Sequence, residues 1–399
     1  MSTGISERAG VGLGTAAFAL SIGFLTVVRV NLNKPDHLIH SLHGGDSKLR
    51  SFVGECLPAK STGYWALCPF DVGGMLQTSV MFAWRNLRRL VAGRVVHQRQ
   101  LLPLSDGGTI ALDYAYHRGN SLPLDTTYPP DRPVVILLHG MLGDARSEYL
   151  YSLTGQLLEL GYQPVVVVSR GCGDLQLTTS KSFSWFDVDD VHEALVHLRS
   201  SLFKTHRFVG VGFSLGAGQL LKYLAQERSE VVKLDLSIAI SPPWSISQKE
   251  PLFDFFWSPL LVIPLKIFLI RHHHMLKRPD IPLWKVLLTP NLQHWDELFC
   301  RAYGLSNVEE YYALGSAATT AHLIKTPTIA VSSLDDGICS AKGLPLSISN
   351  PSLALLTSHY GGHLAFPKNN LSLGSWIDDF IVSAIVRVHE QRQLVHSSI

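Results

Sequence analysis

Short apolar runs alternate with amphipathic stretches along the chain from about residue 97 to its C-terminal end. The run at 134–138 is Val-Val-Ile-Leu-Leu, which is typical of a strand that is covered on both faces. Stretches in which apolar residues recur every three or four positions predict helices between such strands. This alternation predicts an α/β fold with a mostly parallel sheet and helices on both of its faces. Further strands are expected at 164–168, 208–212, 234–240, 328–333 and 353–357, and helices at 147–160, at 187–202, from 216 onward and at 373–388.

Two segments depart from this alternation. Residues 97–104 and 109–116, joined by Ser-Asp-Gly-Gly, predict a β-hairpin ahead of the parallel strands. Between about 241 and 320 the pattern lapses into a stretch rich in Phe, Trp and Pro, which contains the apolar run 260–270. An irregular, aromatic-rich insertion between two halves of a sheet predicts a cap over the functional site.

The N-terminal region carries a long uncharged run. Twenty residues at 9–28 contain no charged side chain, and Arg29 ends the run. A helix of this length spans the roughly 30 Å hydrocarbon core of a bilayer. The alternatives are a cleaved signal peptide, whose small-residue cleavage pattern is missing after residue 28, and a buried helix of a soluble core. We expect one transmembrane helix that acts as a signal-anchor. It predicts a single-pass membrane protein of an endomembrane such as the endoplasmic reticulum, rather than a secreted one.

Composition and charge narrow the classes of partner. The 399 residues suffice for one large α/β domain with appendages or for two smaller domains. A net charge of +2 without a run of Lys or Arg gives no basis for nucleic-acid binding. The five cysteines are scattered and lack C-x-x-C spacing, so neither a zinc site nor a disulfide framework is indicated, although one disulfide stays open.

Three consecutive histidines at 272–274 raise the question of metal binding. Carboxylates or cysteines at ligand spacing are lacking nearby. Together with Arg271 and Lys277, the histidines are interpreted as a basic patch that faces solvent or a membrane surface. No metal and no cofactor are therefore expected.

The segment 212–216, Gly-Phe-Ser-Leu-Gly, fits the pattern G-x-S-x-G between a predicted strand and a predicted helix. A sharp strand-to-helix turn exposes a serine nucleophile, here Ser214, and needs small neighbours because the chain is crowded there. An ordinary glycine-rich turn is the plain alternative. A dinucleotide-binding G-x-G-x-x-G is excluded, since Leu215 stands where its last glycine would be.

A serine nucleophile needs a base and an acid that orients the base. The last two predicted strands end in loops that carry such groups, Asp335 and Asp336 in the first and His359 and His363 in the second. The carboxyl ends of parallel strands share one edge of a sheet, and the chain order is Ser, Asp, His. We select Asp336, with Asp335 in reserve, and His363, because two glycines before it let its loop fold over the site. The alternatives are a solvated turn for the acids and a helix cap for His363.

The intermediate of acyl transfer also needs N–H donors for its oxyanion. The backbone N–H groups of Leu215 and Met141 are the candidates, because they follow the serine and lie in the loop after the strand at 134–138. His139 is expected to shape that loop. With Asp144 it also forms H-x-x-x-x-D, a spacing associated with acyltransferases, although Asp144 can equally start a helix.

Several separated motifs resemble one family: Tyr64-Trp65, Gly74-Met75-Leu76-Gln77-Thr78, Leu138-His139-Gly140, Arg170-Gly171-Cys172, Trp295-Asp296-Glu297, Tyr311-Tyr312 and Tyr360-Gly361-Gly362-His363. From about Cys56 to the last helix, the chain resembles the membrane-anchored abhydrolase-domain esterases and lipases. This group of α/β-hydrolases includes YheT-like hydrolases, medium-chain ester synthase/esterases, and monoacylglycerol and phospholipid hydrolases. Its catalytic positions fall on Ser214, Asp336 and His363. Two departures are Trp295 in place of phenylalanine and Gly337 in place of proline, the latter expected to loosen the acid's loop.

The resemblance implies an α/β-hydrolase fold and a serine hydrolase that cleaves carboxylic esters of lipid-like substrates through an acyl-enzyme. Such substrates are short- or medium-chain acyl esters, monoacylglycerol or phospholipid. Acyl transfer to an alcohol by the same triad, and a catalytically silent membrane-anchored binding or scaffold protein, are the alternatives. Residues 253–270 are expected to line an acyl chain, to dip into the bilayer, or simply to form the core of the cap. The expected divisions are an anchor at 1–30, an extension at 31–95, core halves at 96–245 and 321–399, and a cap insertion at 246–320.

Overall fold

The computed structural model describes residues 39–57, 74–92, 94–121, 123–125, 128–247, 253–276, 283–300, 304–368 and 374–396. The anchor expected at 9–28 lies outside these residues. Across the described part of the chain, no helix combines the length and apolar character that crossing a bilayer requires.

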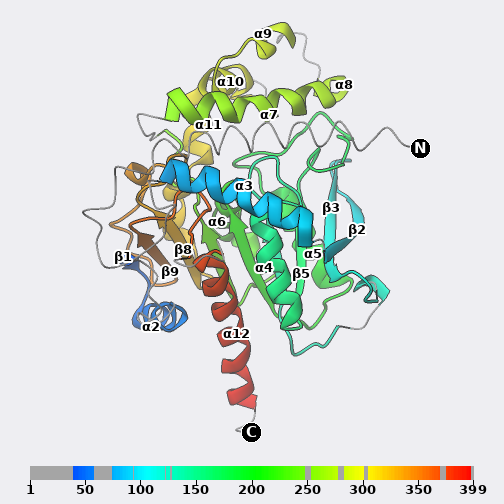
Figure 1. The fold of residues 1–399 in the computed structure, drawn as a ribbon, viewed down its shortest axis with the longest axis vertical. Coiled ribbons are helices and arrows are strands. Elements are labelled where there is room, and N and C mark those ends of the chain that lie inside the picture. The colour runs from blue at the N-terminus through cyan, green and yellow to red at the C-terminus, as the bar shows by residue number, and fades with distance from the viewer. Residues whose placement is uncertain are drawn as a thin grey trace.

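A nine-stranded sheet runs through the middle of the molecule in the order β1-β9-β8-β7-β6-β4-β5-β3-β2 (Figure 1). The six strands from β9 to β5 are parallel, and β1 and the β2–β3 hairpin add antiparallel edges. The predicted α/β fold with a mostly parallel sheet is thus confirmed. The strands are β1 Ile39–Gly44, β2 Val95–Pro103, β3 Thr109–His117, β4 Val134–Leu138, β5 Gln163–Val168, β6 Phe208–Phe213, β7 Leu236–Ile240, β8 Thr328–Ser333 and β9 Leu353–Ser358.

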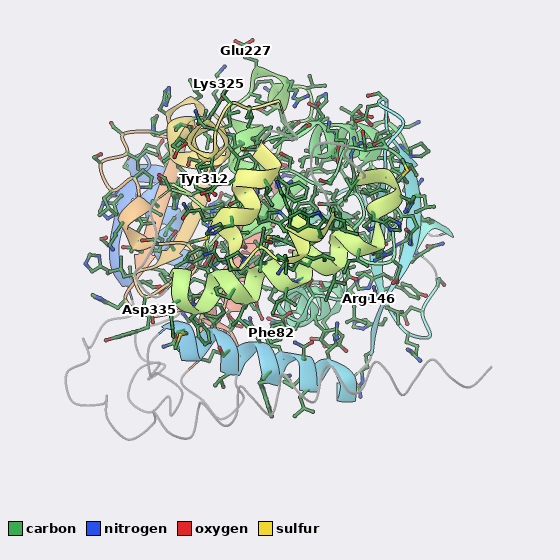
Figure 2. The ribbon with its side chains drawn as sticks, turned by 90° about the horizontal axis from the view of Figure 1, so that it is seen from above. Phe82, Arg146, Glu227, Tyr312, Lys325 and Asp335 are labelled. Atoms are coloured by element: carbon green, nitrogen blue, oxygen red, sulfur yellow. The ribbon has the colours of Figure 1, made fainter. Side chains whose placement is uncertain are left out.

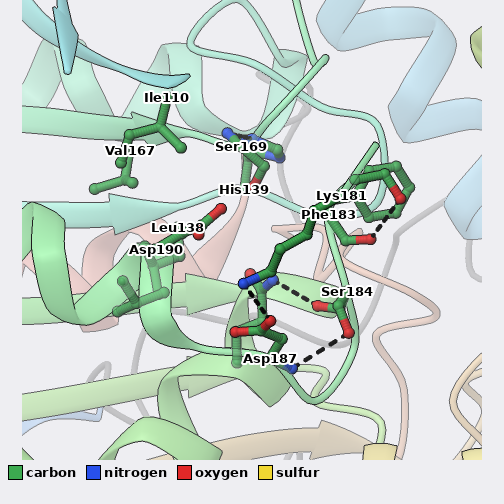
Figure 3. A pocket seen from close by; sticks show the side chains of 13 residues that line it. Ile110, Leu138, His139, Val167, Ser169, Lys181, Phe183, Ser184, Asp187 and Asp190 are labelled. Carbon is green, nitrogen blue, oxygen red and sulfur yellow. Dashed lines mark hydrogen bonds and ion pairs between the residues drawn. The ribbon is translucent and has the colours of Figure 1, made fainter. Parts of the chain in front are cut away.

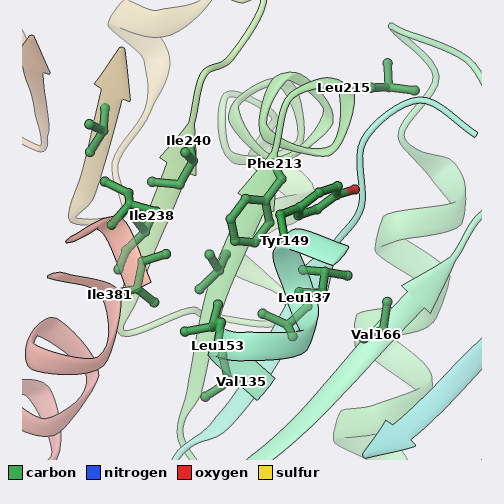
Figure 4. Close-up of a cluster of buried hydrophobic side chains, with 14 of the residues drawn as sticks. Val135, Leu137, Tyr149, Leu153, Val166, Phe213, Leu215, Ile238, Ile240 and Ile381 are labelled. Atoms are coloured by element: carbon green, nitrogen blue, oxygen red, sulfur yellow. The ribbon is translucent and has the colours of Figure 1, made fainter. Parts of the chain in front are cut away.

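Helices cover both faces of this sheet, and every residue of its central strands is therefore buried. In β4, Val135 and Leu137 face a core shared with α4 and α12, and Ile381 of α12 packs there too (Figure 4). Val134 and Ile136 face the opposite core, against α5 and α6. The helices around the sheet are α2 Ser47–Cys56, α3 Gly74–Ala92, α4 Glu148–Glu159, α5 Asp189–Ser200, α6 Leu215–Leu224 and α12 Trp376–His396.

The region before residue 95 contains regular elements that its sequence pattern did not predict. β1 pairs antiparallel with β9 and extends the sheet, and α2 follows it directly. The third element, α3, lies across the molecule below the cap helices (Figure 1). Its position brings it to the loops that follow β8 and β9.

The insertion between β7 and β8 is largely helical rather than irregular. A π-helical turn at Phe253–Trp257 leads into α7, Ser258–Arg271, which contains Pro264. Four shorter helices follow, α8 His273–Leu276, α9 Leu283–Leu287, α10 Leu292–Phe299 and α11 Val308–Gly315. We call the described residues 253–276 and 283–300 the cap. Figure 1 shows these helices gathered beyond one end of the strands, at the top of the view.

Two side chains at the end of α7 fasten the cap to the core. Arg271 donates to the carbonyl oxygens of Gly173 and Leu175, and His272 Nε2 lies 3.0 Å from the carbonyl oxygen of Gly171. The prediction that His272 faces solvent or a membrane is wrong, because its side chain is fully buried. Burial also lowers the pKa of His272, so its imidazole is a neutral packing group.

Candidate active site

Ser214 occupies a strained turn between β6 and α6. Its φ of 52° and ψ of −117° lie where side chains are disfavoured, and its N–H donates to the carbonyl oxygen of Ile240 at 2.9 Å. The flanking glycines are needed for space. A Cβ on Gly216 would lie 2.4 Å from the carbonyl oxygen of Leu138, and one on Gly212 would lie 2.5 Å from that of Gly216. The two glycines therefore allow the turn that projects Ser214.

The structure brings the three predicted side chains into one hydrogen-bonded chain. His363 Nε2 lies 2.8 Å from Ser214 Oγ, and His363 Nδ1 lies 2.9 Å from Asp336 Oδ2. A carboxylate accepts only, so Nδ1 carries the proton and Nε2 is the acceptor that faces the serine hydroxyl. The Asp336 side chain is 1% exposed and that of His363 is 9% exposed. The arrangement suits proton removal from Ser214 in a largely dry site.

The adjacent aspartates have different partners. Asp336 Oδ1 accepts from the N–H groups of Ile338 and Cys339, at 2.8 and 2.9 Å, so its second oxygen remains directed at His363. Asp335 Oδ1 instead accepts from the Gly362 N–H at 2.8 Å and from the Ser333 hydroxyl. Asp335 thus joins the acid's loop to the histidine's loop, while Asp336 accepts from the imidazole.

The histidine that was set aside lies elsewhere. The ring of His359 packs edge-on against that of His40, with 4.8 Å between their centroids. Of the two glycines before His363, Gly362 has a φ of +51°, a conformation that favours glycine. A Cβ on Gly362 would come within 2.4 Å of the carbonyl oxygen of Gly74, so the loop packs tightly against α3.

Helix α3 contributes contacts that sequence reasoning missed. Thr78 Oγ1 accepts from the His363 N–H at 2.8 Å, and Arg85 donates to the carbonyl oxygens of Leu364 and Ala365 at 2.7 and 3.1 Å. Gly74 also approaches the acid's loop, since a Cβ there would lie 1.7 Å from the carbonyl oxygen of Asp335. Figure 2 shows Asp335 beside one end of α3. The only available signal was the motif at 74–78, which the family resemblance singled out without a role.

The predicted oxyanion donors lie beside Ser214. Leu215 is the first residue of α6. Met141 follows Gly140, whose backbone passes so close that a Cβ there would lie 3.3 Å from Ser214 Cβ. The Tyr149 hydroxyl accepts from the Gly140 N–H at 2.7 Å and fixes this loop. The loop that carries Met141 and the first residue of α6 thus both adjoin Ser214.

His139 shapes the same loop from beneath. Its Nδ1 lies 2.6 Å from the carbonyl oxygen of Gly140, and its Nε2 accepts from the Ser169 N–H at 3.1 Å. Burial lowers its pKa and favours the neutral ring. Asp144 does not pair with it. Instead it binds Arg146 at 2.6 Å, and α4 begins only at Glu148, with Ser147 as its N-cap. The structure therefore does not support a catalytic pair of His139 and Asp144 at the H-x-x-x-x-D spacing.

The Arg-Gly-Cys turn after β5 has a packing role. Arg170 is 1% exposed and makes paired hydrogen bonds of 2.7 Å to Asp190, with a further ion pair to Asp106. Figure 3 shows a small pocket near this turn whose lining includes His139 and Asp190, and in which Lys181 and Asp187 form an ion pair of 2.6 Å. These charges satisfy one another and hold the loop that supports the cap.

A larger, mostly apolar pocket lies between the core and the cap. Its lining includes Met141 and Phe183 from the core, Leu265 and Phe268 from α7, and Trp295 and Phe299 from α10. Trp295 and Phe299 are stacked, with 4.5 Å between their ring centroids. The pocket thus extends from the candidate oxyanion loop into the cap.

Among the described residues, one group of His, Cys and acidic side chains is compact enough to hold a metal ion. It consists of Asp336, Cys339 and His363. Two of these three already hydrogen-bond to each other, so the group belongs to the candidate active site.

This fold, with a strained serine in line with a histidine and an aspartate from later strands, defines a class of α/β enzyme. Residues 135–341 match the model of the alpha/beta hydrolase family, and the chain belongs to this family.

Similar proteins carry lipase and esterase names. Phospholipase ABHD3 of Homo sapiens is 24% identical over 396 residues, which cover 96% of this chain and 92% of that protein. Monoacylglycerol lipase of Saccharomyces cerevisiae is 27% identical over 291 residues, which cover 68% and 63%. Among solved structures, Pyrobaculum calidifontis esterase has a TM-score of 0.46 and 15% identity, covering 77% of this chain and 92% of that one. Family and relatives together class the chain as a carboxylic ester hydrolase.

Proposed function

We propose that Ser214, His363 and Asp336 form the catalytic triad of a hydrolase for esters of lipid-like substrates. His363 Nε2 takes the Ser214 proton as Oγ attacks the ester carbonyl, and Asp336 holds the tautomer and stabilises the imidazolium. The N–H groups of Leu215 and Met141 stabilise the oxyanion. His363 then protonates the leaving alcohol as its bond to the carbonyl carbon breaks. In the second half, His363 takes a proton from water as the water attacks the acyl carbonyl, and returns it to Ser214 Oγ as the acid product leaves. The observation that carries the proposal is the 2.8 Å contact between His363 Nε2 and Ser214 Oγ.

The apolar pocket supports an acyl chain as the recognised part of the substrate. It begins at Met141, where the ester carbonyl would meet an oxyanion donor, and continues between Phe268 and Trp295. A chain in this position exchanges water for aromatic and aliphatic contacts. Relatives whose names include phospholipase, monoacylglycerol lipase and ethyl ester synthase/esterase support the same substrate class.

A fluorophosphonate probe tests the triad directly. The folded wild-type chain is expected to label, and Ser214→Ala is expected neither to label nor to hydrolyse a panel of esters of graded chain length. Wild-type protein that is folded and does not label would leave the alternative of a silent binding or scaffold protein. Added alcohol tests transfer, because an ester product would show that alcohol competes with water for the acyl-enzyme.

The N-terminal run at 9–28 supports a single-pass anchor as a separate proposal. Alkaline carbonate extraction of cell membranes is the test. The full chain is expected to stay with the membranes and a chain that begins at residue 31 is expected to leave them. Release of both would count against the anchor.

A further inference from the structure

Large apolar side chains that face solvent are concentrated on the cap. Of eighteen such side chains among the described residues, nine belong to positions 255–288 and are between 37% and 82% exposed. We call these nine the cap face: Phe255, Leu260, Ile263, Ile267, Ile270, Leu283, Trp284, Leu287 and Leu288. Scattered exposed apolar residues are ordinary, but a group of this size marks an interaction surface.

Helix α7 shows how the cap face is built. Leu260, Ile263, Ile267 and Ile270 recur at helical spacing and point to solvent, while Leu265 and Phe268 on the other side line the apolar pocket. Between its ends the helix is therefore apolar around its circumference apart from Lys266, and its outer apolar side chains are exposed within the described part of the chain. Figure 1 shows α9 at the outer limit of the molecule, at the top of the view, with α7 between it and the sheet.

Charge identifies the kind of surface that fits. The two stretches that carry the cap face, 255–276 and 283–294, contain Lys266, Arg271 and Lys285 but no Asp or Glu. The acids of the cap, Asp254, Asp296 and Glu297, lie outside these two stretches. Arg271 and Lys285 are exposed beside the apolar side chains, and His273 and His274 are exposed as well. Apolar groups among cations without acids match the acyl boundary and anionic headgroups of a bilayer.

We propose that the cap face docks on an anionic lipid bilayer, with α7 and α9 lying in the plane of the headgroups. The apolar side chains enter the acyl boundary, and Lys266 and Lys285 contact anionic headgroups. Because the same helix lines the apolar pocket, docking brings that pocket next to the bilayer. The docking itself does not depend on the triad. It is also distinct from an anchor at 9–28, since a tether alone does not require the cap to touch lipid.

A fluorescent label on the cap face tests the contact in the full-length protein. The native side chain of Ile267 is 61% exposed, and that of Val231, outside the cap, is 66% exposed. Ile267→Cys would carry an environment-sensitive nitrobenzoxadiazole group, and Val231→Cys with the same label would be the matched control. With vesicles of phosphatidylcholine and phosphatidylserine, the emission at 267 is expected to shift to the blue and to be quenched by brominated acyl chains. The control is expected to keep its emission, and pure phosphatidylcholine is expected to give a weaker shift at 267.

Two results would overturn the proposal. One is emission typical of water at 267 while the protein is bound to anionic vesicles. The other is emission already shifted without vesicles, because a segment of the chain itself would then cover the cap face. Emission from label attached to the native cysteines is measured on wild-type protein treated in parallel and is subtracted.

Activity supplies a second test whose failure is separate from that of the proposed triad. Ile263→Asp with Ile267→Asp is expected to lower hydrolysis of an ester embedded in anionic vesicles by about 10-fold or more, since charges leave the acyl boundary. Hydrolysis of a water-soluble short-chain ester is expected to stay unchanged, as is vesicle hydrolysis by Val231→Asp. Equal effects on the two substrates would overturn docking.

Discussion

The hydroxyl oxygen of Thr78 accepts a hydrogen bond of 2.8 Å from the backbone N–H of His363. The two residues are separated by 285 positions along the chain. Thr78 also donates to the carbonyl oxygen of Gly74 at 2.7 Å, so its hydroxyl is fixed by the helix that carries it. The candidate base is therefore positioned by α3, an element that lies outside the matched family region at 135–341.

Removing this acceptor tests whether α3 positions the base. Thr78→Val keeps the side-chain shape but leaves the His363 N–H without its partner. One hydrogen bond is worth about 0.5–1.5 kcal/mol, so kcat is expected to fall roughly 2- to 10-fold with KM nearly unchanged. Thr78→Ser, which restores a hydroxyl, is expected to recover most of the rate. Ser79→Ala is the matched control, because the Ser79 hydroxyl bonds only within α3, to Met75. Equal losses in Thr78→Val and Ser79→Ala would refute the positioning role.

The adjacent aspartates separate the proposed acid from its neighbour. Asp336→Asn is expected to lower kcat by roughly 10⁴-fold, because an amide favours the wrong imidazole tautomer. Asp335→Asn keeps an oxygen that can accept from Gly362 and is expected to stay within about 10-fold of wild type. Steady-state hydrolysis of one soluble ester by both variants makes the comparison. The reverse ranking would assign the acid to Asp335.

Sequence reasoning reached the sheet and the candidate side chains because both depend on local patterns. Fully apolar runs predicted the parallel strands, and parallel strands place the loops of Ser214, Asp336 and His363 at one edge of the sheet. No local pattern ranks the two aspartates, so Asp335 stayed in reserve when Asp336 was selected. The structure separates them through the contact of Asp336 with His363 and through backbone N–H groups that no pattern displays. Thr78 and Arg85 of α3 could not be assigned a role, because their contacts with the histidine's loop cross 279 or more positions.

The cap shows the opposite limit of pattern reasoning. Aromatic residues and prolines there obscured helices that form nonetheless, since burial against the core overrides weak propensity. The three histidines at 272–274 looked alike in sequence. The end of α7 turns His272 inward to Gly171 and leaves the next two exposed, a distinction set by packing.

Gly337 departs from the proline expected by resemblance, and the structure gives a steric reason. A Cβ at this position would lie 2.6 Å from Nε1 of Trp257 in the cap. Gly337→Ala is expected to lower the free energy of unfolding by about 1–3 kcal/mol through overpacking, and to reduce kcat by displacing the Asp336 loop. Gly54→Ala is the control, because space around Gly54 in α2 is open and alanine favours a helix. Urea unfolding measures both, and an unchanged stability for Gly337→Ala would refute the clash.

Trp295 tests the acyl pocket. Trp295→Phe removes volume beside Phe299, so the preferred acyl chain is expected to lengthen by about one or two methylene groups. Trp284→Phe is the matched control, since Trp284 is 59% exposed and lies on the cap face rather than in the pocket lining. Relative kcat/KM across esters of graded chain length is the measurement. An unchanged optimum in Trp295→Phe would place the acyl chain elsewhere.

His272 predicts how the stability of the molecule depends on pH. Burial lowers its pKa below the usual 6.5, so the folded chain binds this proton more weakly than the unfolded chain does. The contribution of neutral His272 to the free energy of unfolding is therefore constant above the unfolded pKa. It falls as the pH drops through 6.5 toward the lowered folded value. His272→Gln retains a donor for Gly171 and an acceptor for the Leu177 N–H but does not titrate. Between about pH 7.5 and pH 5.5 its Tm is expected to fall less than that of wild type, whereas His273→Gln, at an exposed position, is expected to follow wild type. Parallel slopes for all three proteins would mean that His272 is not the group that protonates, and the remaining slope would then lie with other buried imidazoles such as that of His139.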